Sequence, residues 1–185
     1  MTGKTVLGIV AMVFLTGSGE AGVKKVLFGG GCFWGIEYAF SRLDGVKDSV
    51  SGYSGGHVED PEYKEVCTDT TGHAEVVEVT YDEEKISFGE LLEFFFKVHD
   101  PTQLNRQGPD YGTQYRSVIY TTDDGQLKEA LEYKSRLERS GRYTRPVVTE
   151  IAPASEFYRA EDYHQDYVIR TGRGCHINLD FLGKK

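Results

Sequence analysis

The spacing of apolar residues predicts a strand, a tight turn and a helix near the start of the chain. Residues 23–29 form a short apolar run that is typical of a strand, and the glycines at 29–31 mark a turn. Beyond the turn, apolar side chains recur at helical spacing at Phe33, Ile36, Phe40 and Leu43. The pattern therefore places residue 32 where a strand passes into a helix.

Further strands and helices are predicted by the same patterns. Strands are expected at residues 46–53, 76–81, 115–122 and 147–151. A second helix should begin after Ser87, because Glu90 three residues later completes a capping box, and should end before Pro101. A third helix is expected over residues 124–140. The long irregular stretches between these elements, about 54–71 and 102–114, are of a length that is usually functional.

The order of the first four strands and two helices is βαββαβ. This order is typical of the split βαβ arrangement, in which helices cover one face of a mixed or antiparallel sheet. We therefore predict an α+β fold, a ferredoxin-like two-layer sandwich. After residue 155 the pattern decays, which predicts an irregular C-terminal coil. With no internal repeat, residues 23–185 are expected to form a single catalytic domain.

The first 22 residues differ from the rest of the chain. Lys4 is the only charge before the apolar run at 6–15, and mostly small residues follow as far as Gly22. This order is typical of a secretory signal peptide, and the run is too short for a bilayer core that needs about 20 residues. We predict export to the periplasm or the exterior. A short buried N-terminal helix on a cytoplasmic protein is the alternative.

Composition narrows the class of protein further. Of the 185 residues, 39% are hydrophobic, which is enough to build a core. The formal net charge is -8 and there is no run of Lys or Arg, so nucleic acid is a poor candidate partner. Three cysteines are too few for a disulfide framework, which favours reactive thiols over structural bridges.

Cys32 is the first of these candidate thiols. At the start of a helix, the unpaired N–H groups and the helix dipole favour a thiolate and lower the pKa of the thiol. Phe33 and Trp34 directly follow it and are suited to cradle a small apolar group of a substrate. The alternatives are that Cys32 is a small buried hydrophobe and that Trp34 is simply part of the core.

Three strings of residues now give a closer comparison. GCFWGIE at 31–37, GHAE at 72–75 and GPDYGTQYR at 108–116 resemble the motifs of the A-type peptide methionine sulfoxide reductases, in that family's order and near its spacing. The resemblance runs from about residue 24 to 180. It implies reduction of the S epimer of methionine sulfoxide, either free or in proteins, which is a known repair of oxidised methionine.

The resemblance also implies roles for single residues. Cys32 matches the family's nucleophile, and Phe33 and Trp34 match the aromatic pair that holds the methyl group of the substrate. Glu75 matches the acid of the family's site.

Three further positions match residues around the sulfoxide oxygen in that family. Tyr63 and Tyr115 correspond to two tyrosines that donate hydrogen bonds to this oxygen. Asp110 corresponds to an aspartate that positions substrate or water.

The chemistry requires an acid, because the sulfoxide oxygen must be protonated as a thiolate attacks the sulfur. Glu75 shares strand parity with Val77, Val79 and Tyr81, so it should face the more apolar side of its strand. Burial there would raise the pKa of Glu75 and keep a proton available near neutral pH. The alternative is a solvated carboxylate at the frayed start of a strand. His73 has the same parity, but we assign it no proton role.

Attack would leave Cys32 as a sulfenic acid, which condenses with a second thiol. Cys175, in a glycine-rich tail beside Arg173, is the expected resolving cysteine, because the family places one in its C-terminal coil. We interpret Cys67 as a buried structural thiol, with a resolving role as the alternative. A dithiol protein of the thioredoxin type is the implied reductant. If the chain is exported, a cytosolic thioredoxin cannot be its direct partner.

Three other functions compete with this interpretation. A thiol peroxidase would need a small polar pocket, and a cysteine hydrolase would need a paired His with an orienting Asn or Asp. An exported binding domain would carry its cysteines incidentally. We expect a monomer with no metal and no organic cofactor, because the histidines show no metal-ligand spacing with the cysteines; they are His57, His73, His99, His164 and His176.

Overall fold

The start of the described chain is a strand, a glycine turn and a helix, as predicted. The computed structural model describes residues 22–173 and residue 177. Strand β1 (Val23–Gly29) leads to helix α1 (Phe33–Phe40), with Cys32 at its N-cap. Gly29 lies so close to its neighbours that a Cβ there would be 2.6 Å from the backbone oxygen of Glu75. Gly31 has a φ of 98°, which side chains rarely adopt, so the turn requires glycine at this position.

The described residues form a mixed sheet of six strands in the order β7-β6-β1-β3-β2-β8. Neighbouring strands are antiparallel except β6 and β7, which are parallel. The strands after β1 are β2 (Val46–Ser54), β3 (Ala74–Asp82), β6 (Val118–Thr121), β7 (Glu150–Pro153) and β8 (Tyr158–Arg159). The predicted α+β class is confirmed. Beyond the four strands of the βαββαβ order, β7 overlaps the fifth strand predicted at 147–151, whereas β8 at the opposite edge is not predicted.

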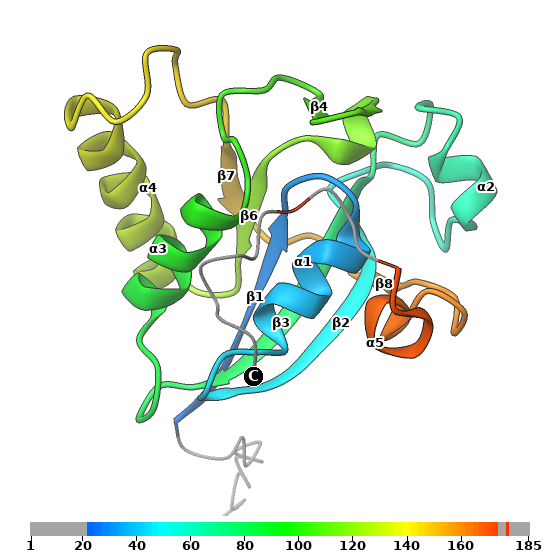
Figure 1. Ribbon diagram of the computed structural model, residues 1–185, viewed down its shortest axis with the longest axis horizontal. Helices are drawn as coiled ribbons and strands as arrows, with labels where there is room; N and C mark the ends of the chain where they lie inside the picture. The colour runs from blue at the N-terminus through cyan, green and yellow to red at the C-terminus, as the bar shows by residue number, and fades with distance from the viewer. Residues whose placement is uncertain (1–21, 174–176, 178–185) are drawn as a thin grey trace, which may run out of the picture.

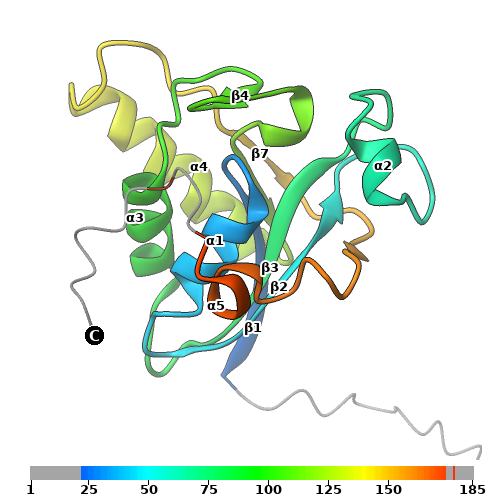
Figure 2. The ribbon, with the colours of Figure 1, turned by 45° about the vertical axis from the view of Figure 1, so that its right-hand side comes forward.

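Helices α1, α3 (Phe88–Val98) and α4 (Asp124–Arg139) lie along one side of the sheet (Figure 1). The capping box predicted at Ser87 and Glu90 is present, since the hydroxyl of Ser87 accepts from the backbone N–H of Glu90. The short element α5 (Tyr167–Thr171) lies against α1, as Figure 2 shows. This contact places the end of the described chain beside the helix that begins at Cys32.

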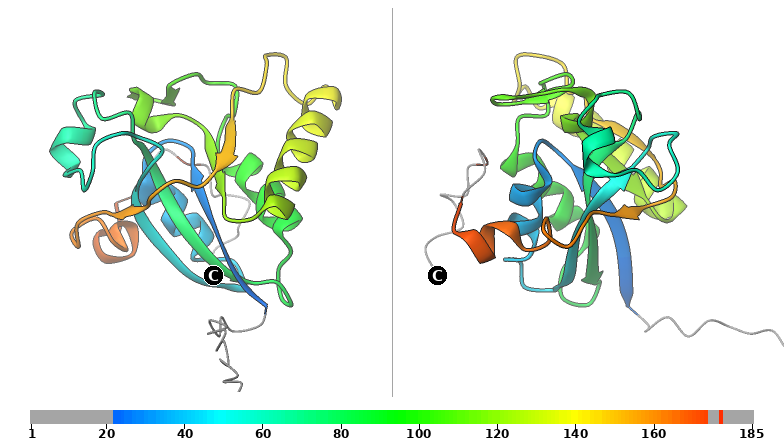
Figure 3. Two further views of the ribbon diagram at one scale, coloured as in Figure 1. Left: turned by 180° about the vertical axis from the view of Figure 1, so that it is seen from behind. Right: turned by 90° about the vertical axis from the view of Figure 1, so that its right-hand side faces the viewer.

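Buried aromatic rings fix α1 and α3 against the sheet. Phe28 of β1 stacks on Phe40 of α1 with ring centroids 4.8 Å apart, and lies 4.9 Å from Phe95 of α3. Burying each such ring stabilises the fold by about 1.5–3 kcal/mol. On the other face of the sheet, a smaller apolar cluster is covered by the chain after β7, including Ala154 and Phe157 (Figure 3, left). The turn that carries Cys32 is therefore supported by a packed core.

The two stretches predicted as irregular contain short elements. The first holds α2 (Tyr63–Val66), and the second holds a small hairpin of β4 (Arg106–Gln107) and β5 (Asp110–Tyr111). A single 3-10 turn, η1 (Thr113–Tyr115), follows the hairpin. The strand predicted over residues 115–122 therefore starts only at β6, because Tyr115 still belongs to this turn.

The prediction of an irregular coil after residue 155 is confirmed only in part, because two short elements interrupt the described part of that segment. β8 pairs with β2, and α5 forms one helical turn and a half. The side chain of Gln165 ties the segment to β2, since its Nε2 donates to the oxygen of Ser51 and its Oε1 accepts from the N–H of Ser51. Tertiary hydrogen bonds of this kind order a polar segment whose local pattern predicts no structure.

The predicted export segment lies outside the described residues apart from Gly22, so export stays a prediction. Among the residues that the structure describes, no helix has the length and apolar character needed to cross a membrane.

Candidate active site

Cys32 stands at the start of α1, on the rim of the core. Its side chain is half-buried and packs against the main apolar cluster. The position at the helix N-cap is the one that the sequence predicts. A sulfur placed there can be reached by a small molecule while its backbone is held by the glycine turn and by α1. The predicted thiolate form of Cys32 stays a prediction.

Glu75 lies directly beside this turn. Its side chain is only 1% exposed, and Oε2 accepts a hydrogen bond of 3.0 Å from the backbone N–H of Phe33, the residue after Cys32. The predicted burial on the apolar side of β3 is therefore confirmed, and a solvated carboxylate at a frayed strand end is excluded. The hydrogen bond fixes the carboxyl group next to the cysteine, since it joins β3 to the first residue of α1.

Tyr115 brings three other predicted residues into one neighbourhood. Burial raises the pKa of its hydroxyl, and electrostatic interactions with Glu75, Asp110 and Cys32 raise this pKa further. Such interactions act on Tyr115 only if the groups are close to its hydroxyl. With a raised pKa, Tyr115 keeps its proton at neutral pH and can donate a hydrogen bond.

Tyr63 is also close to Glu75 and Tyr115. Burial raises the pKa of its hydroxyl, as do a hydrogen bond with Cys67 and the charge of Glu75. Its backbone N–H donates to Glu161 Oε1 at 2.9 Å, which fixes the start of α2. Two tyrosine hydroxyls that stay protonated therefore lie near Glu75, one from α2 and one from η1.

Trp34, two residues after Cys32, provides a half-buried aromatic face that we call the aromatic wall. The indole is half-buried and stacks on Tyr167, with ring centroids 3.7 Å apart and planes 12° from parallel. Its Nε1 donates a hydrogen bond of 3.0 Å to Nδ1 of His164. Phe33, by contrast, is 1% exposed and packs its ring near Tyr53 at 5.8 Å and His164 at 5.0 Å. Phe33 is therefore a core residue, with its ring centroid 6.5 Å from that of Trp34.

His164 is buried at the centre of this aromatic group. Its ring lies 4.4 Å from that of Tyr63 and is 1% exposed. Burial lowers the pKa of His164 below its ordinary value of 6.5, and the charge of Glu161 opposes this effect. Because Nδ1 accepts from Trp34, the neutral ring must carry its proton on Nε2. His164 thus acts as a fixed acceptor that orients the indole.

The site combines a cysteine and a buried carboxyl with two tyrosine hydroxyls and an aromatic wall. Known proteins resemble the chain that carries it. A family model described as peptide methionine sulfoxide reductase matches residues 24–184. The chain belongs to the peptide methionine sulfoxide reductase family. The relative named MsrA in Acidobacterium capsulatum is 53% identical over 84% of this chain and 100% of its own length. The MsrA of Natronomonas pharaonis is 57% identical over 82% of this chain and 85% of its own length.

Solved structures agree with this assignment to the reductase family. Reduced Mxr1 from Saccharomyces cerevisiae is 37% identical and superposes with a TM-score of 0.79, covering 85% of this chain and 90% of its own. Methionine sulfoxide reductase A of Corynebacterium diphtheriae is 39% identical with a TM-score of 0.74, covering 85% of this chain and 79% of its own. Mxr1 has also been solved in complex with Trx2, with 29% identity, a TM-score of 0.58 and coverage of 80% and 87%.

The site of this reductase-family chain contains residues that sequence reasoning missed. Glu161, His164 and Tyr167 recur every third residue, and each contacts a predicted site residue or its support. Their spacing of three residues, on a segment rich in aromatic residues, could have indicated side chains that share one face. The sequence assigns no role to His164, whereas its hydrogen bond with Trp34 gives it a specific structural part in the site.

The interpretation of Cys67 as a buried structural thiol is wrong. Cys67 is exposed at the C-terminal end of α2, because this short helix turns only Val66 into the core. Its thiol instead shares a hydrogen bond with Tyr63 at the edge of the site. Cys175, the expected resolving cysteine, lies outside the described residues. Ile177, two residues beyond it, packs against the main apolar cluster.

His73 and Asp110 complete the predicted set. Nδ1 of His73 accepts from the backbone N–H of Gly56, and its Nε2 lies 2.7 Å from the oxygen of Val58. His73 therefore fastens the loop before β3. Asp110 is half-buried in the small hairpin, with its charge close to Tyr115. Over residues 22–173 and 177, no group of three or more His, Cys, Asp or Glu side chains is arranged to hold a metal ion.

Proposed function

We propose that this chain reduces the S epimer of methionine sulfoxide, free or in proteins, to methionine, with Cys32 as the nucleophile. The observation that carries the proposal is the hydrogen bond between Glu75 and the N–H of Phe33, which joins a buried carboxyl to the residue directly after the attacking Cys32. The half-buried sulfur next to it is accessible to a small sulfoxide. The site thus pairs a nucleophile with a nearby acid.

The first step transfers two electrons from Cys32 to the sulfoxide. The thiolate of Cys32 attacks the sulfoxide sulfur, and Glu75 supplies the proton that the oxygen needs. The oxygen then passes to the sulfur of Cys32: the S–O bond of the substrate breaks, an S–O bond forms on Cys32, and the methionine sulfur leaves as a thioether. The products are methionine and a sulfenic acid on Cys32, so one thiolate, one sulfoxide and one proton are consumed. A positioned general acid typically contributes about 10²–10⁴ in rate.

Other side chains orient the substrate in this proposal. The hydroxyls of Tyr63 and Tyr115 donate to the oxygen as charge develops on it, and their raised pKa values keep both protonated. The methyl group of the substrate rests on Trp34, with Phe33 behind it. Asp110, near Tyr115, positions the rest of the substrate or a water molecule.

Recycling requires a second thiol and an external reductant. The sulfenic acid on Cys32 condenses with the thiol of Cys175, which forms a disulfide and releases water. A dithiol protein of the thioredoxin type then reduces the disulfide by exchange and becomes oxidised itself. The complex of the relative Mxr1 with Trx2 supports a partner of this class. Exposed Cys67 is the alternative resolving thiol.

The N-terminal segment bears on which reductant acts. We propose that residues 1–22 direct export, in which case the reductant is a thioredoxin-like protein of the same compartment. N-terminal sequencing of the protein recovered from each cell fraction tests this, and an intact N-terminus in the cytosol contradicts it.

Single-turnover kinetics test the proposed reaction. With methionine S-sulfoxide and no reductant, the wild-type chain should release about one methionine per chain, while Cys32→Ser should release none. Glu75→Gln should slow the step by about 10²-fold or more, and more at high pH than at low pH if solvent acid substitutes for it. Cys67→Ser is the matched control and should turn over normally with a thioredoxin.

The same assay with hydrogen peroxide separates the main rival. Rapid turnover of peroxide with an inert sulfoxide would identify a thiol peroxidase and refute the proposal. Turnover of an ester or amide without any reductant would favour a hydrolase. An unchanged single-turnover rate in Glu75→Gln would remove Glu75 from the proton transfer.

A further inference from the structure

A polar segment of the chain holds the aromatic wall in place. Residues 161–171, which we call the strap, carry both partners of Trp34, namely His164 and Tyr167. The strap follows β8 and ends with α5. Its position therefore decides where the indole of Trp34 lies, and the side chains that hold the strap act indirectly on the substrate wall.

One anchor of the strap is Gln165, which binds the backbone of Ser51 on β2. Its Nε2 also donates to the oxygen of Ala160 at 2.7 Å, so the start of the strap is tied down on both sides. This anchor lies between His164 and Asp166 in the sequence. It does not by itself fix the part of the strap that follows, which includes Tyr167.

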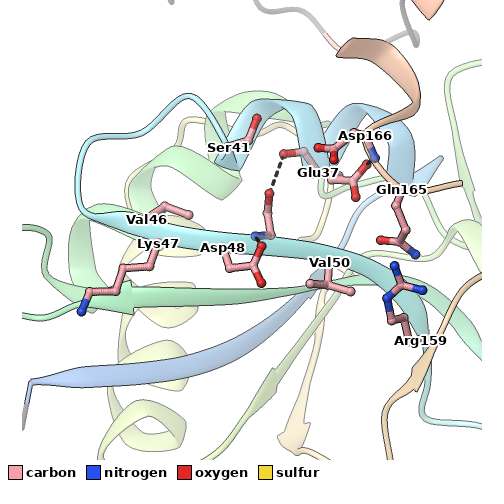
Figure 4. Close-up of a pocket in the computed structure, with 10 residues that line it drawn as sticks. Glu37, Ser41, Val46, Lys47, Asp48, Val50, Arg159, Gln165 and Asp166 are labelled. Carbon is pink, nitrogen blue, oxygen red and sulfur yellow. Dashed lines mark hydrogen bonds between the residues drawn. The ribbon is translucent and has the colours of Figure 1, made fainter. Parts of the chain in front are cut away.

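Glu37 supplies the second anchor, from α1. Its side chain is 2% exposed, and Oε2 accepts a hydrogen bond of 3.0 Å from the backbone N–H of Asp166 (Figure 4). Asp166 has a φ of 52° and is the N-cap of α5, so this N–H stands where the chain turns sharply into the helix. Tyr167, which stacks on Trp34, is the next residue.

The spacing on α1 makes this anchor relevant to the site. Trp34 and Glu37 are three residues apart, so their side chains lie on one side of α1 in successive turns. Trp34 contacts the strap at His164 and Tyr167. Glu37 contacts it at Asp166. The same helix therefore carries both the wall and the group that fixes the wall's partners.

We propose that Glu37 is a positioning residue for substrate binding, which holds the strap through the N–H of Asp166 so that His164 and Tyr167 fix the indole of Trp34. This inference rests on the proposed function. No role of Glu37 follows from the sequence motifs, where it is only the last residue of GCFWGIE. Its carboxyl does not touch the reacting atoms, so its effect is on binding rather than on the chemical step.

The surroundings of Glu37 predict how the anchor responds to pH. Burial raises the pKa of its carboxyl to about 7, with the nearby carboxylate of Asp166 contributing. The lining of the hollow beside Glu37 also includes charged side chains of both signs, Lys47 and Asp48 from β2 and Arg159 from β8. The hydrogen bond from the N–H of Asp166 favours the ionised carboxyl and opposes the effect of burial. Ionisation near neutral pH therefore places a charge in a buried site, which should lower the stability of the contact between α1 and the strap.

The fluorescence of Trp34 gives a direct test, because it is the only tryptophan in the sequence. Glu37→Ala should shift the emission of the substrate-free protein to longer wavelength and raise KM for methionine S-sulfoxide about tenfold, with kcat changed by less than about twofold. Glu37→Gln should restore both values, because its amide oxygen can accept from Asp166. Emission of Glu37→Gln should also lose any change between about pH 6 and 8 that the wild-type chain shows.

Gln126→Ala is the control for a merely structural effect. Gln126 is also buried and bonds to the oxygen of Lys25 and the hydroxyl of Tyr81, on the side of the sheet covered by α4. It should lower stability in urea while leaving emission and KM as in the wild type. Unchanged emission and KM in Glu37→Ala, or equal changes in Gln126→Ala, would overturn the proposal.

The emission readout needs no turnover, so the two proposals fail separately. A red shift of the emission in Glu37→Ala that Glu37→Gln reverses would support the role of Glu37 as an anchor, whether or not the protein reduces the sulfoxide. If neither the wild type nor any variant reduced the sulfoxide, the proposed function alone would be refuted. Normal reduction with no effect of Glu37→Ala on emission or KM would refute the anchor alone.

Discussion

Protonation of His164 should loosen Trp34 and weaken substrate binding. At neutral pH the ring is neutral and its Nδ1 accepts the hydrogen bond of 3.0 Å from Nε1 of Trp34. Burial lowers the pKa of His164 below 6.5, so protonation of the folded protein occurs only in more acidic solution. Once Nδ1 carries a proton it can no longer accept, and the indole loses its fixed partner.

The size of the effect follows from one hydrogen bond. A net contribution of about 1 kcal/mol is typical for such a bond. Its loss corresponds to about a fivefold rise in KM, if the indole must be ordered again for each binding event. Glu161 Oε2 is 3.9 Å from Nε2 of His164, and the negative charge of Glu161 favours protonation of His164. This interaction limits how far burial lowers the pKa of His164.

The direction with pH is fixed by the lowered pKa. The wall is intact at pH values above 6.5 and is lost as the pH falls through the lower pKa of the folded state. The unfolded chain takes up the same proton near pH 6.5, so the folded state also loses stability as the pH falls below that value. KM and Trp34 emission should change together over this acidic range.

His164→Asn provides the matched comparison. The Asn oxygen can take the place of Nδ1 as an acceptor but does not titrate. The KM of this variant should vary less with acid than that of the wild type, and the difference between the two profiles excludes effects of Cys32 and Glu75, which titrate in both. If the profiles coincide, the acidic transition belongs to another group and the reasoning about His164 is wrong.

Three predictions concern stability, each measured by urea unfolding. Burial lowers the pKa of His99 to about 4, so the wild type should lose up to about 3 kcal/mol as the pH falls from 6.5 to 4, and His99→Gln should lack this slope. The raised pKa of Glu37 acts in the other direction: stability should fall as the pH rises from 4.5 to about 7, again by up to about 3 kcal/mol, but not in Glu37→Gln. Gly29→Ala should cost about 1–3 kcal/mol, because its Cβ would press on the backbone of Glu75 and on Val118; an unaffected midpoint would show that the turn can yield.

The sequence predicts the first part of the site well because local patterns determine it. The bounds of β1 are those predicted, since an apolar run is followed directly by three glycines. The parity argument placed Glu75 on the buried side of its strand, and the alternation of β3 bears this out. Both inferences depend only on side chains close together in the sequence.

The strap could not be predicted in this way. The hydrogen bond from Asp166 to Glu37 spans 129 residues, and that from Gln165 to Ser51 spans 114. Polar residues that are ordered by such distant partners have no local pattern. The predicted burial of Cys67 is wrong for a related reason, since its neighbours in the sequence do not show that α2 is too short to bury more than Val66.

In the proposed reaction, Cys32 takes the oxygen of the sulfoxide as methionine is released. The most direct measurement uses the Cys67→Ser, Cys175→Ser double variant, treated with methionine S-sulfoxide and a 1,3-dione that traps sulfenic acids, followed by peptide mass mapping. We expect about one methionine per chain and a trapped adduct on the peptide that contains Cys32. Methionine formed without any adduct on that peptide would contradict it.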